Sequence, residues 1–445
     1  MKIIFYVLAL YAAFQGCYSA ANQPRATKKS TSIDRSTSSV VLPVTGNVYP
    51  RGYYHVTVNI GNPPKPYWLD IDTGSDLTWL QCDAPCTQCT PAPHKLYKPD
   101  KDLVTCMDPL CASVHWPEQH DCGSPKEQCD YEVVYADNGS SVGVLVTDSF
   151  PLQFINGSIA NPRLAFGCGY NQQVPASMDP PYTDGILGLG IGKASILCQL
   201  HELGITRNVL GHCLSSQGGG YLFFGDELVP SSGVTWAPVS TTEIEKHYSL
   251  GTAELNFGGK ASGVKGLHIV FDSGSTYTYL TAQAYKALVS MIIKDMKGKQ
   301  VYIANEDKSL PVCWKGSKPF KYIHDVKNLF KPLKLSFAKN VEFQLDPEAY
   351  LIISKHGNAC LGILNGSEVG LESINIIGDV SLQDKIIIYD NEKQRIGWAP
   401  ANCNELPNLL DDGDPDNGGL CKPYEPNLGI LKAYSAAKWL GLRTN

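Results

Sequence analysis

Short apolar runs, separated by turn residues, form the dominant pattern along the chain. Residues 53–60, 67–71, 131–135, 142–146 and 163–166 are such runs, bounded mainly by Gly, Pro, Asn and Asp. Runs of this length, rich in Val, Ile, Tyr and Phe, are typical of strands in sheets or barrels. The pattern therefore predicts a mostly β protein from about residue 49 onward.

Helical signals are few in this chain. They fall at residues 195–203, 282–296 and 347–351. The segments 236–239 and 248–250 flank a polar stretch, which predicts the junction between two halves. At 445 residues the chain is long enough for two cores, because single cores stop growing near roughly 250 to 300 residues.

Two of the predicted strands end in nearly the same tetrapeptide. Asp-Thr-Gly-Ser occupies residues 72–75, and Asp-Ser-Gly-Ser occupies residues 272–275, each after an apolar run and before another. One copy alone is an ordinary turn sequence. Two copies in matching surroundings indicate an internal repeat.

A second pair of motifs follows the first in the same order. Residues 184–189 read Asp-Gly-Ile-Leu-Gly-Leu, and residues 375–379 read Asn-Ile-Ile-Gly-Asp. Each half therefore contains Asp-x-Gly-Ser and then two aliphatic residues with a Gly. On these paired motifs, residues 48–402 resemble the pepsin-like aspartic proteases, and within them the plant nucellin-like or nepenthesin-like branch.

The resemblance implies an all-β, bilobal acid protease fold. Two β-barrel lobes, related by a pseudo-twofold axis, would flank an active-site cleft, and each would contribute one catalytic aspartate, Asp72 and Asp272. The implied activity is that of an aspartic endopeptidase acting on a peptide or protein substrate, with no cofactor and no metal. The alternative is a protease-like inhibitor or binding protein with weak catalysis. Inactive relatives usually lose an Asp or its Gly, and this chain keeps both sets.

Two carboxyl groups that share one proton can hydrolyse a peptide bond without a metal or a nucleophilic serine. The ionised group removes a proton from water, and the protonated group polarises the carbonyl, as in aspartic proteases generally. In each motif the glycine permits a tight turn and the last serine can donate to the carboxylate. The residue after each Asp is expected to brace the loop. The predicted support of the pair thus comprises Thr73, Gly74, Ser75, Ser273, Gly274 and Ser275.

A hairpin over the pair is predicted at residues 133–146, where two Val-rich runs flank a turn signal. By resemblance, Tyr135 is the flap tyrosine that contacts substrate and Trp79 is the tryptophan that supports it. The flap departs from the commonest pattern, because Ala136 replaces Gly and one extra residue precedes Gly139. Residues 139–143 also fit the G-x-S-x-G elbow of serine hydrolases around Ser141, but no helix follows them.

The chain ends carry their own signals. Lys2 precedes an apolar run of signal-peptide length, and small residues follow, so residues 1–21 are predicted as a secretory signal. Residues 22–46 are polar and basic, which fits either a short pro-segment or a spacer. The remaining divisions are an N-terminal lobe with a cysteine-rich insert at 47–240, a C-terminal lobe at 241–402 and a tail at 403–445. The expected destination is extracellular (cell wall) or vacuolar.

Fifteen cysteines agree with an oxidising compartment, since fourteen remain after Cys17 of the predicted signal. Seven of them lie between residues 82 and 129. Disulfides are the favoured interpretation, and the resemblance pairs Cys313 with Cys360. The alternative is a zinc knot formed by Cys82, Cys86 and Cys89 near His94, His115 and His120.

Charge and composition exclude some functions. A net charge of −6 and a pI near 5.9 give no basic surface for nucleic acid. After the predicted signal, no run approaches bilayer length, so no membrane anchor is predicted, and a monomer is expected. Glycosylation sequons predict glycans at Asn156 and Asn365, whereas Asn138 in the flap is expected to be unoccupied or outward-facing.

Overall fold

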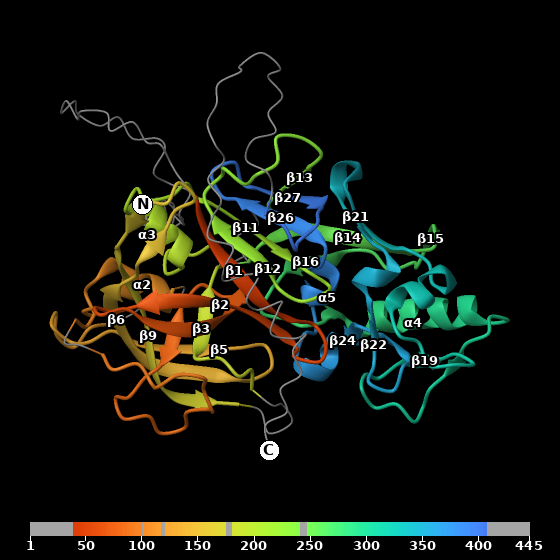
Figure 1. Ribbon diagram of the computed structural model, residues 1–445, viewed down its shortest axis with the longest axis horizontal. Coiled ribbons are helices and arrows are strands. Elements are labelled where there is room, and N and C mark those ends of the chain that lie inside the picture. The colour runs from red at the N-terminus through yellow and green to blue at the C-terminus, as the bar shows by residue number, and fades with distance from the viewer. Residues whose placement is uncertain (1–38, 100–101, 117–120, 175–179, 241–246, 407–445) are drawn as a thin grey trace, which may run out of the picture. The chain divides into compact units, whose positions relative to one another are not determined.

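The computed structural model describes residues 39–99, 102–116, 121–174, 180–240 and 247–406 (Figure 1). The predicted signal peptide and nearly all of the predicted tail lie outside these residues. Strands dominate the described part, which confirms the prediction of an all-β protein. Among the described residues, no helix combines the length and apolar character needed to cross a bilayer.

The largest sheet contains thirteen strands and takes members from both ends of the chain. Strand β26, coloured blue in Figure 1, pairs with β11, and β27 pairs with the other edge of β26, so both join this sheet from the predicted C-terminal lobe. In order across the sheet, the strands are β13 (Thr235–Pro238), β27 (Arg395–Pro400), β26 (Lys385–Asp390), β11 (Val209–Leu214), β12 (Gly220–Phe224), β1 (Val40–Asn47), β2 (Tyr53–Ile60), β3 (Lys65–Asp72), β10 (Gly185–Gly188), β4 (Trp79–Gln81), β9 (Arg163–Gln173), β6 (Ser140–Ser149) and β5 (Asp130–Val134).

Three smaller sheets complete the strand structure of the described residues. The eight-stranded sheet has the order β21 (Glu342–Leu345), β20 (Leu333–Ser336), β14 (Ser249–Phe257), β16 (Leu267–Phe271), β25 (Ile374–Ile377), β17 (Thr278–Leu280) and β24 (Ile363–Asn365), and β15 (Lys260–Ala261) pairs with β14. The four-stranded sheet holds β18 (Tyr302–Ile303), β19 (Cys313–Lys315), β23 (Ala359–Leu361) and β22 (Leu351–Ile353), and the two-stranded sheet holds β7 (Leu152–Gln153) and β8 (Ile159–Ala160).

The two halves of the chain repeat one strand arrangement. In the first half the order is β3-β10-β4-β9, and in the second half it is β16-β25-β17-β24. In each, the first and second strands are parallel, the second and third antiparallel, and the third and fourth parallel. The repeat seen in the tetrapeptides is therefore also a repeat of topology.

Alternation along β3 explains which face each residue occupies. Tyr67, Leu69 and Ile71 are buried in the main hydrophobic core. Because side chains alternate along a strand, Asp70 and Asp72 point to the opposite face. Strand β3 is thus anchored by its apolar face while its other face presents acidic side chains.

Four α-helices lie in the described part of the chain: α2 (Pro109–His115), α3 (Ile196–Glu202), α4 (Ala282–Met296) and α5 (Asp379–Leu382). The predicted helices at 195–203 and 282–296 are confirmed. The third, at 347–351, is only a 3-10 turn at Pro347–Ala349, and β22 begins at Leu351. Further 3-10 turns lie at Ile323–Asp325, Lys327–Leu329, Ala338–Asn340 and Gly366–Val369.

Two observations concern the ends of the predicted lobes. Strand β1 begins at Val40 and pairs with β2 and β12, so the last residues of the segment 22–46 belong to the folded sheet. Cys403, where the tail was predicted to begin, is joined to Cys213 of β11 by a disulfide. Removal of any pro-segment stays a prediction.

Candidate active site

The two Asp-x-Gly-Ser loops hold their aspartates in equivalent ways. The Gly74 amide donates to Asp72 Oδ1 at 2.8 Å, and the Gly274 amide donates to Asp272 Oδ1 at 2.9 Å. The Ser75 hydroxyl donates to Asp72 Oδ2, and Ser275 Oγ donates to Asp272 Oδ2 at 2.9 Å. Each carboxylate therefore accepts, on both of its oxygens, hydrogen bonds from the loop that carries it.

The two loops also contact each other. A Cβ atom placed on Gly74 would lie 2.6 Å from Asp272 Oδ1, and one placed on Gly274 would lie 2.5 Å from Asp72 Oδ1. Each glycine is thus packed against the carboxyl group of the opposite loop, at a distance that excludes a side chain. The structure brings Asp72 and Asp272 to one point, although they are 200 residues apart in sequence.

Gly274→Ala is expected to lower activity at least tenfold, because the new methyl group must displace the Asp72 carboxyl. Neither loop glycine has a left-handed φ, so the cost arises from this contact and not from backbone strain. Displacing a reacting group by about 1 Å can cost on the order of a hundredfold in rate. Peptide-cleavage kinetics measure the effect. The matched control is Gly123→Ala, where the nearest atom belongs to the flexible, exposed Glu127 side chain; equal activities of the two variants would contradict the packing argument.

Thr73 and Ser273 lock the two loops together by a symmetrical set of hydrogen bonds. The Thr73 amide donates to Ser273 Oγ at 3.1 Å, and the Ser273 amide donates to Thr73 Oγ1 at 3.0 Å. Each hydroxyl in turn donates to a carbonyl in the opposite half, Thr73 to Phe271 and Ser273 to Ile71. Because both side chains are fully buried, these bonds fix the loops relative to each other.

The electrostatics of the pair favour a retained proton. Burial raises the pKa of Asp72, the neighbouring Asp272 carboxyl raises it further, and hydrogen bonds from Ser75 and Gly74 only partly oppose this rise. Two carboxyl groups in contact cannot both ionise easily, so their protons leave in separate steps. The pair therefore keeps one proton to a pH well above the ordinary range of an aspartate.

Two further carboxyl groups lie near the pair, and the sequence analysis did not single them out. Asp70 precedes Asp72 by two residues on β3, and Asp379 is the first residue of α5. Burial raises the pKa of both far above the usual value, and the charges of Asp72 and Asp272 add to the rise. The available sequence signal was an acidic residue inside an otherwise apolar predicted strand.

A hairpin is present at the position of the predicted flap. Strands β5 and β6 pair with Val134 opposite Ser140, and the Tyr135 amide donates to the Gly139 carbonyl at 2.8 Å. Asn138 occupies the turn with a left-handed φ of 68°, a conformation that Asn tolerates well. Trp79 Nε1 donates to the Tyr135 hydroxyl at 2.6 Å. Burial and then the Asp72 charge raise the pKa of Tyr135, so this hydroxyl keeps its proton beside the acidic pair.

The serine-hydrolase alternative does not fit the structure. Ser141 is fully buried in β6, and its hydroxyl shares a 2.9 Å hydrogen bond with that of Tyr131. A nucleophile elbow instead exposes its serine on a turn between a strand and a helix.

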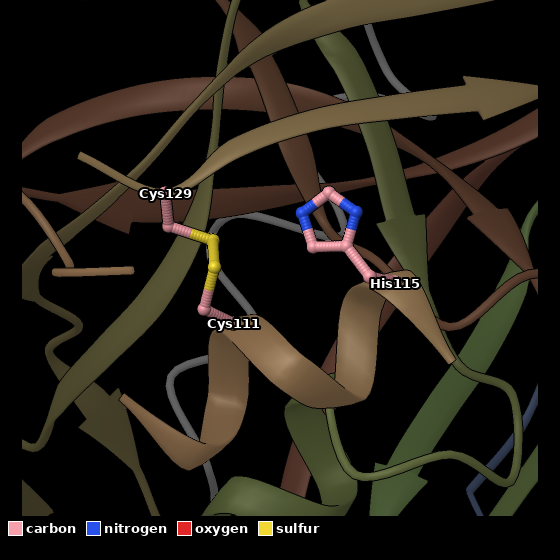
Figure 2. A group of neighbouring side chains, drawn as sticks. All are labelled: Cys111, His115 and Cys129. Atoms are coloured by element: carbon pink, nitrogen blue, oxygen red, sulfur yellow. A yellow bond between two sulfur atoms is a disulfide. The ribbon is translucent and has the colours of Figure 1, made fainter. Parts of the chain in front are cut away.

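The zinc alternative fails because the sulfur atoms are bonded to one another. Cys82 pairs with Cys168 and Cys86 pairs with Cys89, while His94 Nδ1 lies 2.7 Å from the Asp184 carboxylate. Figure 2 shows the same situation at Cys111 and Cys129, which are disulfide-bonded beside His115 of α2. A disulfide offers no thiolate to a metal. His120 lies outside the described residues. The further disulfides in the described part are Cys106–Cys122, Cys213–Cys403 and Cys313–Cys360.

Comparison with known proteins agrees with this geometry. Two family profiles match the chain, one described as xylanase inhibitor N-terminal over residues 54–226 and one as xylanase inhibitor C-terminal over residues 247–400. An aspartic proteinase of Oryza sativa subsp. japonica is 47% identical over 83% of this chain and 92% of the rice protein. Aspartic proteinase nepenthesin-2 of Nepenthes gracilis is 27% identical over 83% of this chain and 81% of its own length.

Solved structures share the fold at low sequence identity. The basic 7S globulin of soybean superimposes with a TM-score of 0.64 and 16% identity, covering 84% of this chain and 100% of the globulin. An aspartic proteinase from Irpex lacteus superimposes with a TM-score of 0.58 and 17% identity, covering 82% of this chain and 98% of that enzyme. The predicted bilobal, pepsin-like fold is therefore confirmed. The chain belongs to the family of pepsin-like aspartic proteases, in the plant branch that includes nepenthesin.

Proposed function

We propose that this chain is an aspartic endopeptidase in which Asp72 and Asp272 share one proton and activate a water molecule. The observation that supports this most strongly is the mutual packing of the two loops, in which each glycine touches the opposite aspartate. A binding protein has no need for two acidic groups held together at the cost of burial. Hydrolysis by one ionised and one protonated carboxyl group does need that arrangement.

The proposed reaction follows from the two protonation states of the pair. The ionised carboxyl removes a proton from a bound water, whose oxygen attacks the peptide carbonyl. The protonated carboxyl donates to the carbonyl oxygen as negative charge develops there, and the proton taken from water is later given to the leaving nitrogen. The amides of Gly74 and Gly274 and the hydroxyls of Ser75 and Ser275 hold the carboxyl groups in place throughout.

Tyr135 is proposed to close the site over the substrate. Its hydroxyl accepts a hydrogen bond from Trp79, which leaves its own proton free to donate to a substrate group or a water. The flap turn also approaches the second half of the chain, since a Cβ on Gly370 would lie 3.7 Å from the Ala136 carbonyl oxygen. A substrate held under this hairpin would be shielded from solvent.

Tyr135→Phe is expected to lower kcat/KM by roughly tenfold to a hundredfold, which corresponds to about 1.4 to 3 kcal/mol of transition-state stabilisation. The ring and its packing remain, so only the hydroxyl interaction is lost. Steady-state kinetics on a fluorogenic peptide measure the change. Tyr182→Phe, which removes a hydroxyl from an exposed tyrosine, serves as control. A Tyr135→Phe variant as active as the control would exclude the proposed contact.

A second candidate function is suggested by the family descriptions, which name xylanase inhibitors. Under this alternative the chain would bind a partner protein and cleave little. Cleavage of an unfolded protein at acid pH, blocked by a statine-type transition-state analogue, would support the enzyme. Absence of cleavage across the acid to neutral range, in a chain processed at its N-terminus, would support the inhibitor.

Several further properties are proposed on the same basis. The six described disulfides suit a protein of the secretory pathway, and we expect an extracellular or vacuolar, monomeric enzyme. Asn156 is exposed and Asn365 is partly exposed, so both remain candidates for glycosylation. Asn138 is also exposed, at the tip of the flap turn, which suits the expectation that any glycan there faces outward.

A further inference from the structure

Tyr389 of β26 reaches the interlocked Asp-x-Gly-Ser loops from the second half of the chain. Its side chain is fully buried, and its hydroxyl forms a hydrogen bond with the Thr73 side chain. Burial raises the pKa of Tyr389, the bond with Thr73 partly opposes the rise, and the charge of Asp272 adds to it. Tyr389 therefore contacts the loop that carries Asp72 and lies near the carboxyl group of the other loop.

His212 of β11 contacts the same hydroxyl. Strand β11 pairs with β26 so that His212 lies opposite Ile387, and the two side chains are diagonal neighbours on one face. Nε2 of His212 lies 3.3 Å from the Tyr389 hydroxyl oxygen, and His212 is fully buried. Burial lowers the pKa of His212 to about 3, so above that pH the ring is neutral and has one N–H to donate.

The direction of these hydrogen bonds follows from the groups around Thr73. Its hydroxyl donates to the Phe271 carbonyl at 3.2 Å and accepts from the Ser273 amide at 3.0 Å. Because its one hydrogen is used, Thr73 can only accept from Tyr389, and the Tyr389 oxygen in turn accepts from His212. The proton of His212 is thereby assigned to Nε2, and Nδ1, which is buried without a hydrogen-bond partner among the described residues, carries the lone pair.

Packing holds the Tyr389 ring in place. The ring of Tyr248 lies against it with centroids 4.2 Å apart, and both tyrosines are fully buried. Tyr248 is itself fixed, because its hydroxyl accepts from Asn391 Nδ2 at 3.1 Å and its carbonyl accepts from the Phe271 amide at 2.9 Å. The Tyr389 hydroxyl is thus held at one position beside Thr73.

We propose that Tyr389 is a positioning residue of the active site, because its hydroxyl orients the Thr73 hydroxyl and thereby holds Asp72 in place relative to Asp272. This proposal rests on the proposed function. Thr73 follows Asp72 directly, and its hydroxyl makes two of the bonds that join the loops. Without the donor from Tyr389, that hydroxyl is free to turn away from Phe271 and the loops separate slightly.

The test compares kcat and KM of wild type and Tyr389→Phe on one fluorogenic peptide. The substitution keeps the ring and removes only the hydroxyl. Displacing a reacting group by about 1 Å can cost on the order of a hundredfold, so for a smaller shift we expect kcat to fall roughly tenfold and KM to change less than about twofold. An unchanged kcat, or a loss carried by KM alone, would overturn the proposal.

Tyr350→Phe is the matched control for a purely structural effect. Tyr350 is also fully buried, and its hydroxyl donates to the Lys331 carbonyl at 2.7 Å. Both substitutions remove one buried hydrogen bond, so we expect both to lower Tm, while kcat of Tyr350→Phe stays within about twofold of wild type. Equal losses of kcat in the two variants would overturn the proposal.

Thr73→Val tests whether Tyr389 acts through Thr73, since it removes the hydroxyl and keeps a side chain of similar shape. We expect kcat of the Thr73→Val, Tyr389→Phe double variant to equal that of Thr73→Val, because the contact is already lost. The effects of Thr73→Val and Tyr350→Phe should instead multiply. Multiplying effects of Thr73→Val and Tyr389→Phe would overturn the proposal.

Thermal unfolding of the same variants does not need an active enzyme. The Tm losses of Thr73→Val and Tyr389→Phe should sum to more than the loss of their double variant, whereas those of Thr73→Val and Tyr350→Phe should add. Additive losses for Thr73 and Tyr389 would overturn the proposal even in a chain that cleaves no peptide. Non-additive losses in a chain without cleavage would instead contradict the proposed function alone.

Discussion

Replacing Asp272 by Asn is expected to lower kcat/KM by about four orders of magnitude, close to the loss seen when one member of a catalytic unit is removed from other proteases. An amide cannot exchange a proton with its neighbour or serve as a general base. Because Asn has nearly the same shape, its Oδ1 can still accept from the Gly274 amide, and its Nδ2, in place of Oδ2, can donate to the Ser275 hydroxyl. Asp72→Asn should have an effect of similar size, since the two loops are equivalent in structure.

Peptide cleavage at acid pH measures this loss, with Tm recorded in parallel to exclude unfolding. Asp226→Asn is a suitable control, because Asp226 is an exposed residue of the first half and contacts Arg207 at only 3.9 Å. The losses of activity caused by the two active-site substitutions should not add. The double variant should be no less active than either single variant. Near-normal turnover by either single variant would disprove the proposed roles.

The folded protein is expected to be most stable at acid pH and to lose stability as the pH rises toward neutral and alkaline values. The pKa values of Asp70, Asp72 and Asp379 are raised above the ordinary value of 3.8, first by burial and then by the charges of neighbouring carboxyl groups, which for Asp72 is Asp272. Between those values the folded state binds more protons than the unfolded state. The free energy of unfolding therefore falls by about 1.4 kcal/mol per pH unit for each proton that the folded state retains and the unfolded state has lost.

Thermal unfolding followed from about pH 4 to about pH 8 measures this dependence. The stabilising contribution is fully present below the ordinary aspartate pKa and is lost as the pH passes through the raised values in the folded state. Asp379→Asn should weaken the dependence of Tm on pH, because Asn does not titrate and one of the three groups that retain a proton in the folded state is removed. A wild-type Tm that is constant over this range, or that rises with pH, would contradict the assignment of buried protonated carboxyl groups.

The sequence was informative wherever a short segment determines its own structure. The helix at 282–296 begins after Thr281 and follows a continuous helical pattern, so its bounds could be read directly. The flap at 133–146 was also predictable, since two Val-rich runs flank a turn. The paired Asp motifs predicted both the fold and the candidate site, because a repeat with matching surroundings implies matching structure.

Long-range pairing could not be obtained in the same way. Nothing in the spacing of Cys82 or Cys213 indicates a bond to Cys168 or Cys403, which lie 86 and 190 residues away. Likewise, the strands at 385–400 look like part of the second half, yet β26 forms its ladder with β11 of the first half. A strand's own sequence specifies its faces, while its neighbours depend on the whole chain.

The contacts of individual side chains were hidden for a related reason. Asp70 lies in a strand that was predicted correctly, but the surroundings of its side chain depend on His55, Ile186 and Asp379 from three other elements. Helix α2 was missed because it is only seven residues long. Its start depends on the side chain of Asp108, which accepts a hydrogen bond from the Leu110 amide, and Pro109 is the first helical residue. Such features require coordinates.

Binding of a statine-containing peptide, followed by isothermal titration calorimetry from acid to mildly alkaline pH, tests the central claim most directly. This compound imitates the tetrahedral state formed when water adds to the peptide carbonyl, so it needs both aspartates and their one shared proton. The account predicts one bound molecule per chain at acid pH, weaker binding as the pair loses its proton, and no binding by the Asp72→Asn, Asp272→Asn double variant. Binding that is equally tight in wild type and double variant, or absent from wild type at every pH, would contradict it.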